Sequence, residues 1–238
     1  MKVSIPLLAT IAAFITGVPA QADSFLPPSV QEASSADGSI VVTVVPAMLS
    51  CAVGEADCEP AARAIVEHFR GDYRSNSRTV RLLNPQAPAR VLVTDDGERL
   101  LTVDDYASYG FGENVLVVYG SKGEVIARHA LKDFLPQDYI NGLPRTVSTL
   151  RWWGAAPRIE PGTHRAIISL HLVGPDSDIP RAFQGPHIAL ALDLDTGEIE
   201  SPSGTLWENA LNCARANSWL VPDVAAERQR ERYRQLCR

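Results

Sequence analysis

Residues 91–103 read VLVTDDGERLLTV, and a similar pattern returns as VLVVYGSKGEVIA in residues 115–127 and as IALALDLDTGEIE in residues 188–200. Each segment has an apolar run, a short turn that contains Gly-Glu, and a returning run. Two such runs joined by a glycine-containing turn are typical of a β-hairpin, because glycine readily adopts the positive φ that the turn requires. The three segments predict an antiparallel β-meander, to which residues 165–173, RAIISLHLV, add a further strand.

The segment before the hairpins is predicted to contain one strand and one helix. Residues 39–45, SIVVTVV, form a β-branched run that indicates a buried strand. Asp57 is a suitable N-cap, and Gly71 would end the helix that follows. The apolar face of this helix would consist of residues at helical spacing: Ala62, Ile65, Val66 and Phe69.

The C-terminal part, residues 205–238, is predicted to be a helical hairpin. Thr205 and Glu208 match the capping-box pattern, in which two side chains satisfy each other's backbone donors at a helix start. After Pro222 the charged run DVAAERQRERYRQLCR predicts a second helix with supportive Glu and Arg spacing.

Together these elements predict an α+β fold that is mostly β, with one N-terminal helix. Residues 23–38 would be a flexible leader and residues 39–238 a single domain. A closed propeller needs at least four blades of about 40–50 residues. The β-rich part, residues 79–203, suffices for two or three. We therefore expect an open propeller-like or sandwich-like array, whose exposed edges could pair with a second copy.

The first 22 residues predict export. Lys2 precedes an apolar run over residues 5–18, and residues 19–22, PAQA, match the small-residue pattern of a signal-peptidase site. The run is too short for a membrane span, and no second long apolar run follows. The expected location is the periplasm or the medium. The net charge of −6 argues against a nucleic-acid partner, which would need a basic face.

The four cysteines are predicted to form disulfides, because export leads to an oxidising compartment. Four cysteines allow three pairings. The local scheme, Cys51 with Cys58 and Cys213 with Cys237, is favoured because each pair lies within one predicted structural unit.

The stretch from Arg90 to Gly154, which contains two of the glycine turns and LPRTVSTLRWWG, resembles a group of uncharacterised bacterial exported proteins with β-propeller-like hairpin blades. Residues 188–200 resemble the outer hairpin of such a blade. The resemblance implies a hairpin architecture, and it implies no activity and no catalytic residue.

The candidate binding residues are aromatic. Arg151, Trp152 and Trp153 are adjacent, and on a strand the two indoles would face opposite sides, which would leave one ring available to a sugar or a protein. The loop of residues 104–114, DDYASYGFGEN, adds Tyr106 and Tyr109.

Two further kinds of site have weaker signals. Asp193, Asp195 and Glu200 follow part of a calcium-loop spacing, although Thr196 stands where a ligand is usual. Hydrolysis could use adjacent carboxylates or a serine–histidine pair. The residues that carry that alternative are Asp104, Asp105, Ser169 and His171.

The sequence therefore predicts a non-catalytic binding or interaction module of the cell envelope. Its partner would be an envelope protein or a glycan, and no cofactor is indicated. The alternative is a hydrolase that acts on envelope glycan or peptide. The sequence leaves the oligomeric state open.

Overall fold

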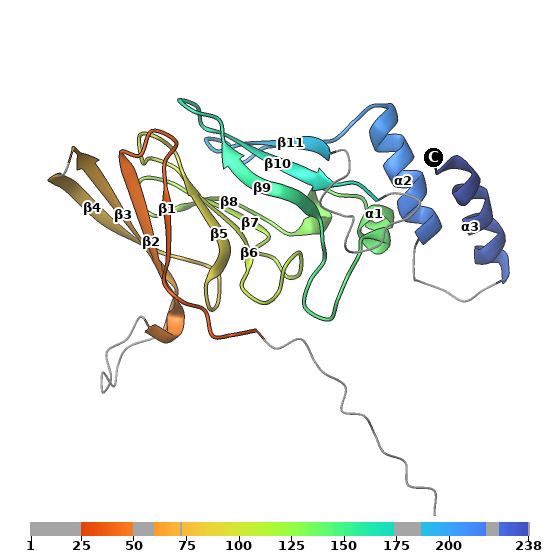
Figure 1. Ribbon diagram of the computed structural model, residues 1–238, viewed down its shortest axis with the longest axis horizontal. Coiled ribbons are helices and arrows are strands. Elements are labelled where there is room, and N and C mark those ends of the chain that lie inside the picture. The colour runs from red at the N-terminus through yellow and green to blue at the C-terminus, as the bar shows by residue number, and fades with distance from the viewer. Residues whose placement is uncertain (1–24, 50–59, 72, 174–186, 218–223, 238) are drawn as a thin grey trace, which may run out of the picture.

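The protein is described by a computed structural model for residues 25–49, 60–71, 73–173, 187–217 and 224–237. In these residues, three four-stranded antiparallel sheets follow one another along the chain (Figure 1). The first sheet consists of β1 (Gln31–Ser34), β2 (Ile40–Val45), β3 (Arg63–Arg70) and β4 (Tyr73–Arg81). The second consists of β5 (Pro88–Val93), β6 (Leu100–Asp105), β7 (Leu116–Tyr119) and β8 (Val125–His129). The third consists of β9 (Trp153–Ile159), β10 (Arg165–His171), β11 (His187–Asp193) and β12 (Ile199–Glu200).

The helical elements are short until the C-terminal part. The 3-10 turns η1 (Ala47–Leu49) and η2 (Leu131–Asp133) lie between strands, and α1 (Gln137–Gly142) precedes the third sheet. The long helices are α2 (Thr205–Asn217) and α3 (Val224–Leu236). The prediction of a mostly β meander with a C-terminal helical pair is confirmed.

The two central strands of the second sheet, β6 and β7, are buried on both faces. Successive side chains of a strand point to opposite faces, and in β6 the side chain of Leu100 packs with the first sheet while that of Leu101 packs with the third. In β7 the same alternation separates Val117 from Val118. Figure 1 accordingly shows the second sheet between the other two, with α2 and α3 at the far end.

The predicted N-terminal helix is wrong, because residues 63–70 form strand β3. Ala62, Ala64 and Val66 are each fully buried and face the same side at a spacing of two residues. Ile65, which the helical pattern placed on the buried face, is only half-buried. Gly71, with φ of 59°, lies in the turn between β3 and β4 instead of ending a helix.

The predicted leader is partly ordered. Within residues 23–38, strand β1 pairs with β2 through the register Gln31↔Val44 to Ser34↔Val41. The side chain of Gln31 also donates a hydrogen bond to the carbonyl of Pro88 in the second sheet, at 3.1 Å. Strands β1 to β4 therefore form a complete four-stranded sheet that the sequence did not predict.

The three predicted glycine turns are confirmed. Gly97, Gly123 and Gly197 have φ values of 72°, 82° and 77°. Gly197 also lies against Ala127 of β8, because a Cβ atom on that glycine would stand 2.1 Å from the Ala127 Cβ. The turn between β11 and β12 therefore packs onto the second sheet.

The C-terminal helices are joined as predicted by a disulfide between Cys213 and Cys237. Cys213 and Trp207 of α2 are buried in the core between the second sheet, the third sheet and α1, which we call the main core. Trp207 packs there against Tyr139 of α1. The predicted pair of Cys51 and Cys58, and the predicted signal peptide, lie outside the described residues. Among the helices that the structure describes, none is long and apolar enough to cross a membrane.

The disulfide is expected to contribute strongly to stability. The bond closes a segment with a sequence separation of 24 residues, and the chain-entropy cost of that closure predicts about 3 kcal/mol. Replacing Cys213 and Cys237 together by alanine should lower the free energy of unfolding in urea by that amount. The exposed neighbour Leu236→Ala is the control, and an unchanged midpoint in the double variant would contradict the prediction.

Candidate functional site

A fully buried carboxylate, that of Asp104, lies where β6 enters the loop of residues 104–114. It accepts hydrogen bonds from Trp152 Nε1 at 3.0 Å, Trp153 Nε1 at 2.8 Å and the backbone N–H of Gly110 at 2.7 Å. Its φ of 58° lies in the left-handed region, which is unusual for a residue other than glycine. These three donors hold the loop and both tryptophans to one acceptor group.

Burial raises the pKa of Asp104 to about 6, although the hydrogen bonds from Trp153, Gly110 and Trp152 each act to lower it. At pH 7 the group is therefore a carboxylate whose oxygens accept all three hydrogen bonds. A proton added near pH 6 would make one oxygen a donor and would remove the buried charge, so the folded chain binds this proton more tightly than the unfolded chain does.

The prediction that Trp152 and Trp153 face opposite sides is wrong. Trp152 lies just before β9 and is fully buried, with Phe134 edge-on at a ring separation of 5.5 Å. Trp153 is half-buried, and its indole N–H reaches the same carboxylate as that of Trp152. Regular alternation does not apply here, because the chain enters β9 between these residues and the β9–β10 pairing contains register shifts.

The neighbouring carboxylate of Asp105 belongs to a second polar cluster. It accepts hydrogen bonds from Asn84 Nδ2 at 2.8 Å and from Asn114 Nδ2 at 3.2 Å. Burial raises the pKa of Asp105, while these two hydrogen bonds and the charge of Arg128 lower it. Arg128 donates to Asn114 Oδ1 at 2.9 Å and forms an ion pair with Glu113 at 2.9 Å. Both ends of the loop are thereby fixed.

The predicted binding residues Tyr106 and Tyr109 contact the N-terminal segment. The ring of Phe25 lies edge-on to both, at ring separations of 5.8 and 6.0 Å. The hydroxyl of Tyr106 also donates to the carbonyl of Leu26 at 2.5 Å. These rings thus hold the chain just before β1. Arg151 is half-buried, and its backbone N–H donates to Pro144 at 2.9 Å.

The same loop borders a cavity of about 410 Å³, which we call the loop cavity. Residues 110–113 form one wall, and η2 with α1 forms the other. The lining residues are Gly110, Phe111, Gly112, Glu113, Ala130, Leu131, Lys132, Gln137, Ile140, Asn141, Arg145 and Leu150.

Polar groups of several kinds surround the apolar base of the loop cavity. The amides of Gln137 and Asn141 are hydrogen-bonded at 2.8 Å, and Arg145 donates to the Ile140 carbonyl at 2.8 Å. Lys132 adds an exposed ammonium group, and Phe111 contributes a half-buried ring that packs on the core. An aromatic surface with amide and cationic donors suits a polar ligand that has an apolar face.

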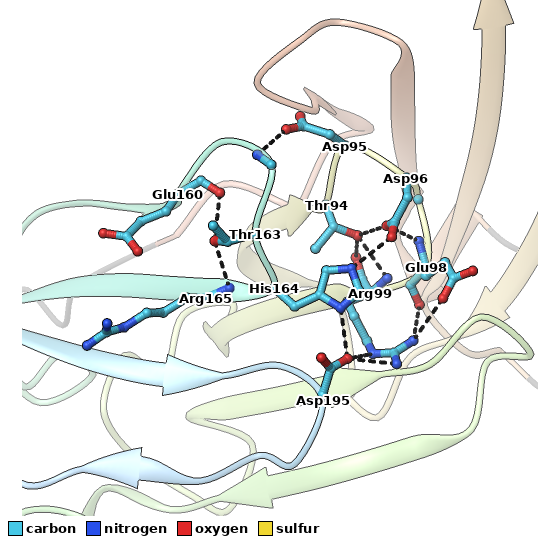
Figure 2. A network of polar contacts seen from close by, with 12 residues as sticks. Thr94, Asp95, Asp96, Glu98, Arg99, Glu160, Thr163, His164, Arg165 and Asp195 are labelled. Carbon is cyan, nitrogen blue, oxygen red and sulfur yellow. Dashed lines mark hydrogen bonds and ion pairs between the residues drawn. The ribbon is translucent and has the colours of Figure 1, made fainter.

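A separate polar cluster, away from the loop of residues 104–114, joins the turns of the second and third sheets (Figure 2). His164 lies between two carboxylates, with Nε2 at 2.8 Å from Asp96 Oδ2 and Nδ1 at 2.8 Å from Asp195 Oδ1. Arg99 donates to the same Asp195 oxygen from Nε at 2.9 Å. We call these four residues the turn junction.

Asp95 extends this contact to the first sheet. Its carboxylate accepts hydrogen bonds from the backbone N–H of Asp37 at 3.1 Å and from that of Gly162 at 2.8 Å. The hydroxyl of Ser39 donates to the Asp95 carbonyl at 3.2 Å. One turn of the second sheet therefore contacts turns of both other sheets.

The turn junction shifts the pKa values of its members. Hydrogen bonding to Asp195 is the largest cause that raises the pKa of His164, and partial burial opposes it. Burial would raise the pKa of Asp96, but hydrogen bonds from Thr94, the Glu98 backbone and His164 lower it to about 2. Both shifts favour a charged imidazolium–carboxylate arrangement.

The residues of the predicted calcium site bind backbone and side-chain groups of this chain instead. Asp193 Oδ1 accepts from the backbone N–H groups of Asp195 and Thr196, at 2.8 and 2.9 Å. Glu200 forms an ion pair with Arg165 at 3.2 Å. In the part of the chain that the structure describes, no three histidine, cysteine or acidic side chains form a group that could hold a metal ion.

The residues of the hydrolase hypothesis are not brought to one place. Ile168 and Leu170 of β10 point into the main core, which also contains Trp152. By alternation, Ser169 and His171 point to the opposite face of this sheet. The Asp104 carboxylate lies on the core side, where it binds the Trp152 indole.

Comparison with models of protein families and with curated proteins gives no match. Sequence reasoning found the loop of residues 104–114 but missed the opposite wall of its cavity, and it missed the turn junction. The motif Asp-Gly in the first hairpin marked Asp96 as a turn residue only. No local pattern links it to His164, which lies 68 positions away.

Asp104→Ala is expected to destabilise the fold. The methyl group accepts no hydrogen bond, so the indole N–H groups of Trp152 and Trp153 and the Gly110 amide lose their acceptor. We expect a loss of about 3 kcal/mol in the free energy of unfolding, measured by urea titration at pH 7. The matched control is Asp138→Ala, at an exposed ion pair with Arg215, which should lower the free energy of unfolding by less than about 1 kcal/mol. Equal effects of the two substitutions would contradict the assigned role of Asp104.

The turn junction predicts a specific pH dependence. The pKa of His164 is higher in the folded chain than in the unfolded chain. Its contribution to the free energy of unfolding is therefore complete below the pKa of the unfolded chain, and it is lost as pH rises through the pKa of the folded chain. Because the pKa of Asp96 is lowered to about 2, its contribution is lost as pH falls from near 4 toward 2. Between pH 6 and pH 9 the free energy of unfolding of wild type should therefore fall by about 1 kcal/mol more than that of His164→Gln. His187→Gln is the control, and parallel stability curves for wild type and His164→Gln would refute the coupling.

Proposed function

We propose that the protein is an exported, non-catalytic binding module of the cell envelope, and that its loop cavity binds an envelope glycan. The observation that carries the proposal is the loop cavity, about 410 Å³ in volume, beside a loop fixed by two carboxylates. A pre-formed site of this kind loses little conformational entropy when a ligand binds.

The lining favours a glycan over other ligands. The ring of Phe111 offers an apolar surface for one face of a sugar, and the amides of Gln137 and Asn141 offer donors and acceptors for hydroxyl groups. Lys132 and Arg145 would attract carboxylated sugars. An envelope protein remains the second candidate partner, and it would have to insert a polar side chain into the same cavity.

The alternative, a hydrolase that acts on envelope glycan or peptide, has less support. Asp104 is buried and its oxygens already accept three hydrogen bonds, so it is poorly placed to reach a glycosidic bond. Ser169 and His171 lie on the other face of the third sheet from the core that contains Trp152.

One assay distinguishes binding from hydrolysis. The purified protein is mixed with peptidoglycan sacculi, and the pelleted protein and the released soluble fragments are both measured. We expect co-sedimentation without release of fragments. Release that scales with the amount of protein would favour the hydrolase, and the absence of both would overturn the glycan proposal.

Variants locate the site. Lys132→Ala combined with Asn141→Ala removes an ammonium and an amide from the cavity lining and should weaken binding at least about tenfold. Lys122→Ala, in the exposed turn between β7 and β8, is the matched control and should bind as wild type does. Equal binding by the double variant and wild type would place the ligand elsewhere.

A further inference from the structure

Strand β4 is the longest strand of the described chain, at nine residues, and it forms one edge of the first sheet. Its residues are exposed apart from Arg78 and Val80, and Tyr73 is 81% exposed. Figure 1 shows the β3–β4 hairpin at the end of the molecule away from α2 and α3. The edge is therefore accessible over a length of about 30 Å.

The register shows which backbone groups face outward. Leu82 N–H donates to the Ala62 carbonyl at 2.8 Å, and the pairs Ala64↔Val80 and Val66↔Arg78 continue the same register. In an antiparallel ladder, every second residue bonds to the neighbouring strand and the residues between bond outward. The N–H and C=O groups of Ser77 and Thr79 therefore point away from β3, where an added strand would meet them.

The charge of this hairpin is opposite to that of the whole chain. Residues 63–81 contain five arginines and two acidic residues, whereas the chain has a net charge of −6. One of the acidic residues, Glu67, already pairs with Arg74 at 2.5 Å. The arginines are Arg63, Arg70, Arg74, Arg78 and Arg81. Arg74, Arg78 and Arg81 lie on β4 itself, so a strand that pairs with β4 would lie beside them. Arg78 also donates a hydrogen bond to the Gly97 carbonyl of the second sheet.

We propose that the β4 edge binds an extended acidic segment of another protein by strand addition. Backbone hydrogen bonds from Ser77 and Thr79 would supply much of the affinity, and cross-strand pairs between arginine and acidic side chains would supply the selectivity. Pairing of two β4 strands from two copies is disfavoured, because it would place arginine-rich strands side by side. This surface lies on a different sheet from the loop cavity, so the inference does not depend on the glycan proposal.

The test uses two nine-residue peptides with the purified protein. One alternates threonine with glutamate and the other alternates threonine with lysine. Fluorescence anisotropy should show at least about tenfold tighter binding of the glutamate peptide, with an affinity that falls as salt rises. Equal affinities, or no binding of the glutamate peptide at millimolar concentration, would overturn the proposal.

Two substitutions at one position separate strand addition from simple charge attraction. Thr79→Pro removes an outward N–H that β3 does not use, whereas Thr79→Val keeps it. We expect the proline variant to bind the glutamate peptide at least about tenfold more weakly and the valine variant to bind it as wild type does. Circular dichroism checks that both variants fold. Equal binding by the two variants would exclude strand addition.

Sedimentation velocity tests the other occupant. If wild type forms a dimer that Thr79→Pro abolishes, a second copy occupies the edge, and the acidic partner is excluded. A monomer in both cases is the result expected from the charge of the hairpin.

Discussion

The fold depends on the central strands of the second sheet, β6 and β7, being buried on both faces. In β6 and β7, neighbouring residues such as Leu100 and Leu101 are both fully buried, yet they point in opposite directions. A sheet of this kind loses its stabilisation if either face meets water, since each exposed leucine forfeits about 2 kcal/mol of burial free energy. The first and third sheets cover these two faces, and strands β1 to β4 form the first of them.

Asp104 places a charged group within this apolar arrangement. An unpaired carboxylate at such a position would cost several kcal/mol, and the two indole donors with the Gly110 amide offset part of that cost. These donors come from the loop and from the start of the third sheet. The Asp104 carboxylate therefore fixes the position of the loop relative to the third sheet. Gly110 also lines the loop cavity, so the same hydrogen bonds hold one wall of that cavity in place.

The sequence predicted those parts of the structure whose conformation is determined by residues close together in the chain. The turns at Gly97, Gly123 and Gly197 follow from backbone preference, and the C-terminal helices follow from their periodicity and their cysteines. Strand β3 was missed because Ala62, Ile65, Val66 and Phe69 fit a helical period while Ala62, Ala64 and Val66 fit a strand, and only the neighbouring strands decide between them. The tryptophan pair and the turn junction depend on contacts across 48 and 68 residues. Propensity carries no information about contacts of that range.

Three four-stranded sheets leave strand edges and turns at the surface, and those of this chain have different contacts. Gln31 of β1 bonds across to Pro88, and the Gly197 turn packs onto β8. At the turn junction, Asp96 and Asp195 of the acidic body are held in turns by His164 and Arg99. Those carboxylates are not presented along a strand, so they cannot pair in register with β4 of a second copy. The arginines of the β3–β4 hairpin thus disfavour pairing of like copies while leaving the edge open to an extended acidic chain from elsewhere.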